Sequence, residues 1–120
     1  SVNLNFNFMS FYLNNVEQKA VTKVLLDIVN ADGRVTIGES RYFQQLENVM
    51  GIADSDIEEA KYMSAVGSLE IIKQMLPHEK QAIAIMMLEM IRADGDIDNE
   101  EVKVFLTVCA FAKIPLPEGA

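Results

Sequence analysis

Two short acidic loops hold the residues of this sequence that are best suited to chemistry. One reads NADGRVTIGE from position 30, and the other reads RADGDIDNEE from position 92. Each places a Glu seven residues after the Asp of an Ala-Asp-Gly triplet, which pairs Asp32 with Glu39 and Asp94 with Glu101. Carboxylate oxygens are the ligands that hard divalent cations such as Ca²⁺, Mg²⁺ and Mn²⁺ prefer. The candidate metal ligands are Asp32, Glu39, Asp94, Asp96, Asp98 and Glu101.

The second loop is the more acidic of the two. It has five acids within eight residues and no base among them. Asp94, Asp96 and Asp98 match positions one, three and five of an EF-hand loop, but Asn99 stands at the required Gly and Phe105 at the bidentate Glu. An EF-hand is therefore not predicted, and a weaker oxygen-ligand site is the remaining metal hypothesis. The second loop is expected to bind better, because Arg34 opposes a cation in the first.

Helix capping is the alternative explanation of the same residues. Thr36 and Glu39 have the spacing of a capping box, and so do Asp98 and Glu101. The two glutamates are thus explained without a ligand. The first Asp of each loop follows a helix, where the helix dipole disfavours negative charge, although Asp-Gly is also ordinary turn chemistry. A compensating partner is expected there, either a basic side chain or a cation.

Other kinds of site find little support. His78 and Cys109 are the only histidine and cysteine, too few for the usual ligands of a zinc site. We find no Gly-rich phosphate loop and no nucleophile with an evident base partner, so we predict that the chain is not an enzyme. The formal net charge of −8 argues against binding to nucleic acid.

Apolar spacing predicts that six helices position these loops. The pattern becomes helical after about position 11, with the spacing clear over 17–31; the first helix is expected to end before Gly33 and the second at Gly51. The third is expected to begin with Ser55 and Glu58 as a capping box. The fifth is the most apolar and is expected to be the most buried. The second, fourth, fifth and sixth helices are predicted over residues 37–50, 68–76, 78–93 and 99–112.

The chain also repeats itself at an offset of 62 residues, which places positions 17–51 over 79–113. Each repeat is a helix, an acidic loop and a helix, and neither hairpin can bury its apolar face alone. We therefore predict an all-α helical bundle built from two repeats with pseudo-two-fold symmetry. The predicted organisation is an extended N-terminal arm over 1–10 and a helical domain over 11–120, with repeat one at about 16–51, a connector at 52–77 and repeat two at about 78–113.

The N-terminal arm over 1–10 is assigned from a sequence period of two residues, which differs from the helical period of the rest of the chain. Val2, Leu4, Phe6 and Phe8 alternate with polar residues, which is the pattern of an extended segment. No stretch reaches the roughly 18 to 20 apolar residues that a membrane span needs, since Glu89 interrupts the most apolar run. No signal peptide is recognisable either, so a cytoplasmic location is expected, with membrane association only through partners.

The repeated pattern of helix, Ala-Asp-Gly, aliphatic residue, Glu and helix resembles the TerB-like domains of bacterial tellurite-resistance systems. A related domain occurs in DnaJ-type co-chaperones anchored to membranes. The resemblance covers about positions 16–113 and implies an all-helical bundle without established catalysis in stress-response assemblies. It also implies metal binding at the acidic positions, which here are Asp32, Glu39, Asp94 and Glu101.

These observations predict a non-enzymatic module that binds a divalent cation (Ca²⁺, Mg²⁺ or Mn²⁺), a protein partner, or both. The negative charge favours a basic or membrane-associated protein as partner, and a second copy of the chain is another candidate. The alternative is a purely structural domain in which both acidic loops are only caps and turns.

Overall fold

The computed structural model of the chain describes residues 13–93 and 95–117, and the predicted N-terminal arm lies outside them. The described residues form helices joined by turns and contain no strand, so the all-α prediction is confirmed. The helices are α1 (Asn15–Val29), α2 (Ile37–Met50), α3 (Asp54–Lys61), α4 (Ala65–Lys73), α5 (Pro77–Ile91) and α6 (Asn99–Ala112). None of them is long and apolar enough to cross a membrane.

Two helix starts differ from the prediction because other residues make the cap. At α3 the Asp56 carboxylate accepts the backbone N–H of Ala53 at 3.1 Å, so the helix begins before the expected Ser55–Glu58 box. At α4 the Ser64 hydroxyl accepts the N–H of Gly67 at 2.8 Å, and the helix begins three residues earlier than predicted. A good N-cap stabilises a helix by about 1 kcal/mol, enough to move a boundary that apolar spacing leaves open.

Glycine ends the first helix of both repeats, as the sequence predicts. Gly33 and Gly95 have φ values of 79° and 88°, in the left-handed region that other residues enter only with strain. The N–H of Gly33 donates to the Asn30 carbonyl, and the N–H of Gly95 donates to the Arg92 carbonyl. The chain thus turns out of each helix and directs the acidic residues toward the start of the next one.

The core is centred on α1 and α5. α1 packs against α3, α4, α5 and α6, and seven of its residues are buried. α5 contributes eight buried residues, among them Met86, Met87 and Met90, each at most 1% exposed. These methionines fill the core, as the sequence suggests.

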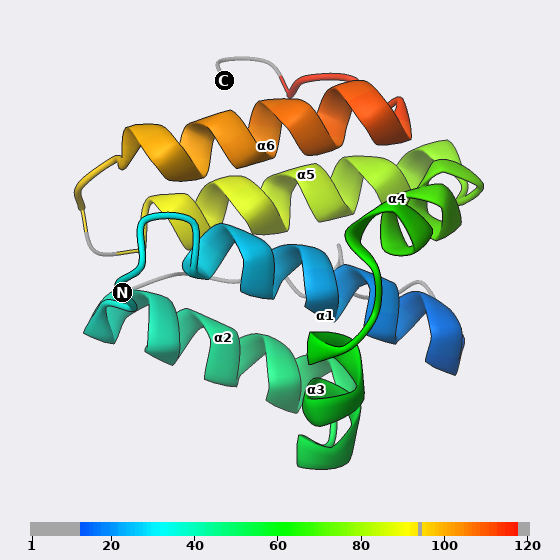
Figure 1. The fold of residues 1–120 in the computed structure, drawn as a ribbon, viewed down its shortest axis with the longest axis horizontal. Helices are drawn as coiled ribbons and strands as arrows, with labels where there is room; N and C mark the ends of the chain where they lie inside the picture. Colours follow the sequence, from blue (N-terminus) through cyan, green and yellow to red (C-terminus); the bar gives the residue numbers. More distant parts are fainter. Residues whose placement is uncertain (1–12, 94, 118–120) are drawn as a thin grey trace.

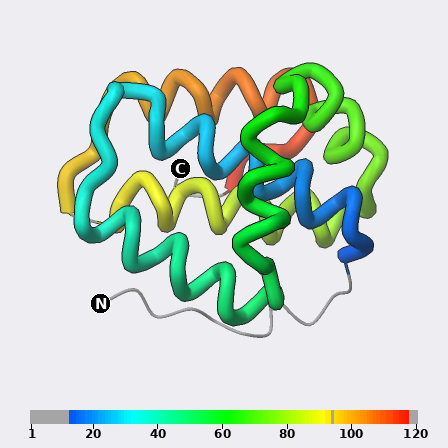
Figure 2. The backbone as a smooth tube through the Cα atoms, turned by 60° about the horizontal axis from the view of Figure 1, so that its bottom comes forward, coloured from blue at the N-terminus to red at the C-terminus, as the bar shows by residue number. Residues whose placement is uncertain are grey.

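The helix packing follows the repeat. The offset of 62 residues relates α1 to α5 and α2 to α6, and the structure contains both the α1–α6 and the α2–α5 contacts. Each repeat therefore places its first helix against the second helix of the other, the reciprocal arrangement that a two-fold relation requires. Both acidic loops lie at the same end of the bundle (Figures 1 and 2).

Candidate functional site

In the first loop, Asp32 makes a local turn. Its Oδ1 accepts the backbone N–H of Arg34 at 2.9 Å. This bond lowers the pKa of Asp32, and the Asp98 side chain and the charge of Arg34 lower it further against the opposing effect of burial. The residue is therefore a carboxylate at neutral pH, held by ordinary Asp-Gly turn chemistry and by a contact with the other loop.

Glu39 forms the capping box that the sequence predicts. The Thr36 hydroxyl accepts the Glu39 N–H at 3.1 Å, and Glu39 Oε1 accepts the Thr36 N–H at 3.0 Å. Glu39 is nonetheless only 2% exposed. A glutamate is rarely buried so completely when the bond from a capping N–H is its only interaction. Its side chain therefore faces the interior as well as the helix start.

The second loop keeps the cap but not the reciprocal bond. Asp98 Oδ1 accepts the N–H groups of Glu100 and Glu101 at 2.8 and 3.1 Å. In the part of the chain that the structure describes, the Glu101 carboxyl does not return a bond to the Asp98 N–H, so the capping-box prediction is wrong for Glu101. Its side chain instead forms a hydrogen bond with Glu39 from the other repeat.

The two loops thus meet in one acidic cluster, defined as Asp32, Glu39, Asp98 and Glu101. Glu101 is 3% exposed, and burial raises its pKa to about 9, with the hydrogen bond to Glu39 and the charges of Glu39, Asp32 and Asp98 adding to the effect. At neutral pH Glu101 therefore carries a proton and donates it to the Glu39 carboxylate. Two carboxyl groups that share one proton are the usual result when like charges are held together away from water.

The cluster contains four of the six predicted metal ligands. Asp96 is exposed, and Asp94 lies outside the described residues. Within residues 13–93 and 95–117, no group of three or more His, Cys, Asp or Glu side chains has the arrangement needed to hold a metal ion. The structure therefore brings the two acidic loops together, and the described carboxyl groups do not by themselves form a ready-made metal site.

A second buried polar pair joins α2 to α5. Tyr42 is 1% exposed, and its hydroxyl lies beside the Glu89 carboxyl group. Burial raises the pKa of both groups; the Glu89 charge adds to the rise for Tyr42, while the Tyr42 hydroxyl and the Arg92 charge oppose the rise for Glu89. This pair was not predicted from the sequence, although Glu89, the acid that interrupts the most apolar run, was its visible signal.

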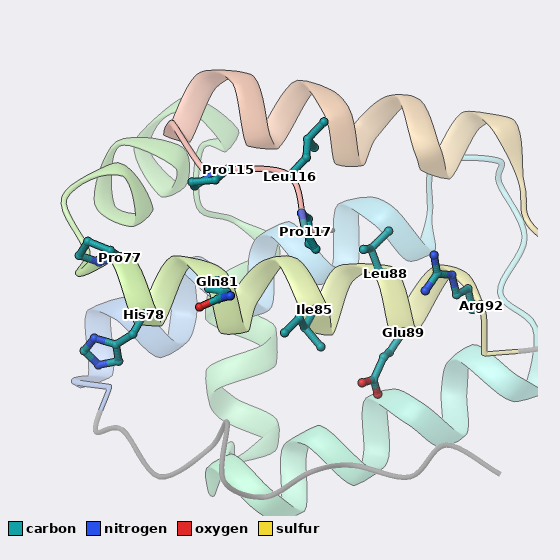
Figure 3. A pocket seen from close by; sticks show the side chains of 10 residues that line it. All are labelled: Pro77, His78, Gln81, Ile85, Leu88, Glu89, Arg92, Pro115, Leu116 and Pro117. Atoms are coloured by element: carbon teal, nitrogen blue, oxygen red, sulfur yellow. The ribbon is translucent and has the colours of Figure 1, made fainter. Parts of the chain in front are cut away.

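Glu89 also borders a hollow of about 870 Å³ on the outer side of α5, which ends at the segment 115–117 (Figure 3). Ile85 and Glu89 point toward the side on which α2 lies, and Leu88 points toward the segment 115–117 (Figure 3). The lining combines aliphatic side chains with Gln81, His78 and Arg92.

Comparison with known proteins supports the fold alone. No family model matches the chain, and no curated protein matches it. A crystal structure of a protein of unknown function from Porphyromonas gingivalis W83 is similar, with a TM-score of 0.77 and 21% sequence identity. The similarity covers 89% of this chain and 90% of that one. The six-helix arrangement thus occurs in a second protein of nearly the same extent.

Proposed function

We propose that this chain is a non-enzymatic, TerB-like helical module that binds one divalent cation where its two acidic loops meet. The observation that supports this proposal is the contact between carboxyl groups of different repeats, Glu39 with Glu101 and Asp32 with Asp98. Four acids that converge from two loops repel one another unless protons or cations are bound. Ca²⁺, Mg²⁺ or Mn²⁺ would supply that neutralising charge through oxygen ligands.

The proton on Glu101 determines how a cation would bind. Carboxylates bind metal ions in their deprotonated form, so a cation must displace the proton shared by Glu39 and Glu101. Cation affinity is therefore expected to rise with pH up to about 9, the pKa of Glu101. Asp94 and Asp96, in the more acidic loop, are the further residues proposed to ligate the ion.

The proposed setting is a bacterial stress-response assembly of the tellurite-resistance type. The module would bind a basic or membrane-associated protein there, and the resemblance of the repeated loops supports this part of the proposal. The net charge of −8 suits a basic partner surface. Tellurite-resistance genes beside the gene for this chain would support the setting.

Thermal unfolding tests cation binding directly. The wild-type chain is melted at pH 8 in millimolar Ca²⁺, Mg²⁺ or Mn²⁺ and in EDTA, beside Glu101→Gln and the control Glu79→Gln. Glu79 is also a buried capping glutamate, since it accepts the Leu76 N–H at 2.9 Å, but it lies outside the cluster. A cation at 100 times its dissociation constant stabilises the folded state by about 2.7 kcal/mol.

The expected result is a cation-dependent rise in melting temperature for wild type and Glu79→Gln that Glu101→Gln loses. The rise should be larger at pH 8 than at pH 6, and titration should show proton release on binding. If no cation raises the melting temperature of the wild type at either pH, the cation proposal is wrong.

That outcome would leave the structural alternative, a scaffolding domain in which the loops are only caps and turns. The completed caps at Thr36 and Asp98 favour this alternative, and so does the finding that the described residues hold no ready-made metal site. In that case the shared proton alone would relieve the repulsion in the acidic cluster.

A further inference from the structure

Each repeat forms a hollow between the end of its first helix, its acidic loop and its second helix. The first-repeat hollow has a volume of about 530 Å³ and is defined by Leu26, Val29, Val35, Ser40, Phe43 and Gln44. The second-repeat hollow has a volume of about 300 Å³ and is lined by the equivalents of these residues, 62 positions later in the chain. The two hollows are therefore the same feature of the fold, formed once in each repeat.

One lining residue of the second-repeat hollow, Leu116, has no equivalent in the first. It lies in the segment after α6, and its side chain points toward that helix (Figure 3). The position 62 residues earlier is Asp54, which begins α3 and does not line the first-repeat hollow. A leucine from a non-helical segment thus borders the second-repeat hollow. Within residues 13–93 and 95–117, the first-repeat hollow has no such residue, and it is the larger of the two.

The two repeats diverge only after their second helices have ended in the same way. Each ends at a left-handed residue, with φ values of 67° and 55°, and the next residue, Ile52 or Ile114, donates its N–H back to the helix at 2.9 Å. In the first repeat, α3 then begins at Asp54. In the second, Pro115 and Pro117 oppose a new helix, because proline disfavours the helical conformation of the residue before it. The chain therefore continues beside the second-repeat hollow, whereas it starts a new helix after the first repeat.

The first-repeat hollow combines an apolar floor with a polar side. Its floor is aliphatic and aromatic, and Val35 at its edge is 53% exposed. On α2, Ser40 and Gln44 are exposed at the positions where the second repeat has Val102 and Leu106. The floor can bury a leucine side chain, and the hydroxyl and amide groups can bond the N–H and C=O groups that a non-helical backbone leaves unpaired. This combination suits a peptide segment.

The charges along α2 indicate an acidic residue in that segment. Arg41 lines the first-repeat hollow, is exposed, and forms no ion pair within the part of the chain that the structure describes. Its repeat equivalent, Lys103, pairs with Glu100 at 3.2 Å, but Gly38 stands at the position equivalent to Glu100. Glu47 also lines the hollow, six residues further along α2. An acid of the bound segment is therefore expected at the Arg41 end, where the first repeat lacks an acid of its own.

We propose that the first-repeat hollow binds a non-helical segment of a partner protein that carries a leucine and a neighbouring acidic residue. The leucine takes the place that Leu116 has in the second repeat, and the acid pairs with Arg41. A proline on each side of the leucine, as in residues 115–117, restricts the free segment and so lowers the entropy that binding costs.

A peptide copied from the chain itself tests the proposal. Residues 113–118, Lys-Ile-Pro-Leu-Pro-Glu, are synthesised with blocked ends and titrated into the ¹⁵N-labelled full chain in EDTA, so that the result does not depend on cation binding. We expect saturable shifts of the amide signals of Val35, Phe43 and Gln44. Serine in place of the peptide leucine should weaken binding at least about tenfold, because the burial of one leucine side chain is worth about one to two decades in a binding equilibrium. Glutamine in place of the peptide glutamate should weaken binding about threefold.

The pseudo-symmetry supplies a matched pair of protein variants. Val35→Lys places a charge in the first-repeat hollow and should weaken peptide binding at least about tenfold. Ile97→Lys makes the same change at the equivalent position of the second-repeat hollow and should leave the affinity unchanged. The two side chains are 53% and 61% exposed, so both variants are expected to fold. Arg41→Gln should remove the preference for glutamate over glutamine in the peptide.

The absence of binding at millimolar peptide would overturn the proposal. Shifts centred on the second-repeat hollow would also overturn it, and so would an equal loss of affinity in Val35→Lys and Ile97→Lys, because the peptide would then displace the chain's own segment. If the same signals shift with the concentration of the chain alone, and sedimentation shows a dimer, the hollow holds a second copy and the proposal is wrong.

Discussion

The shared proton between Glu39 and Glu101 predicts how stability depends on pH. Glu101 has a folded-state pKa of about 9, well above the ordinary value of 4.5. A pKa that is raised on folding adds stability at low pH, and that stability is lost as the pH rises through the folded pKa. Between about pH 5 and pH 9, Glu101 should therefore reduce the free energy of unfolding by up to about 1.4 kcal/mol for each pH unit.

Glu101→Gln removes this dependence with little change in shape. The amide retains N–H donors for the Glu39 carboxylate and cannot ionise. The variant should match the wild type near pH 5 and exceed its stability by a few kcal/mol at pH 9. For a domain of this size 1 kcal/mol corresponds to about 4 °C in melting temperature, so the difference is readily measured.

The assay is thermal unfolding by circular dichroism in EDTA at one-unit steps from pH 5 to pH 9. Glu79→Gln is the matched control, because it replaces a buried capping carboxylate that does not belong to the acidic cluster. Its curve should run parallel to that of the wild type and close to it, because the Gln side-chain carbonyl can still accept the Leu76 N–H. A Glu101→Gln curve that also runs parallel to that of the wild type across this range would contradict the raised pKa of Glu101.

Three further outcomes are expected. Gly33→Ala should destabilise the chain by about 1 to 2 kcal/mol in urea unfolding, because φ is 79° there, and Gly33→Asn should cost less; equal losses would contradict this. Cys109 is buried, and burial raises the pKa of its thiol to about 11, so a thiol reagent should label it far more slowly in the folded chain than in urea, and equal rates would contradict the burial. Tyr42→Phe removes the buried hydroxyl that lies beside the Glu89 carboxyl group and should lower the free energy of unfolding by about 1 to 3 kcal/mol, whereas an unchanged value would contradict the pairing of these two groups.

Local signals in the sequence were sufficient for most of the architecture. Apolar spacing and glycine stops located the helices, and α2 and α6 have the predicted bounds. The start of α3 was wrong because the Asp56 carboxylate can cap a helix that begins at Asp54, one residue before the expected Ser55. Competing caps of similar strength cannot be ranked from residue types alone.

The contacts within the acidic cluster could not be predicted from the sequence in the same way. The spacing within each loop identified Glu39 and Glu101 and explained both as capping residues. Their contact depends on how the two repeats pack, and no distance along the chain encodes it. The same holds for Tyr42 and Glu89, which are 47 positions apart and meet only because α2 packs on α5.

The reciprocal packing of the two hairpins has a consequence for symmetry. A dimer of one hairpin alone, joined in the same way, would place two identical glutamates beside its two-fold axis. Neither copy could then be assigned the proton, because the two carboxyl groups would be equivalent. In the single chain the two glutamates are no longer equivalent, because Glu39 Oε1 accepts the Thr36 N–H whereas Glu101, among the described residues, has no such bond to the Asp98 N–H.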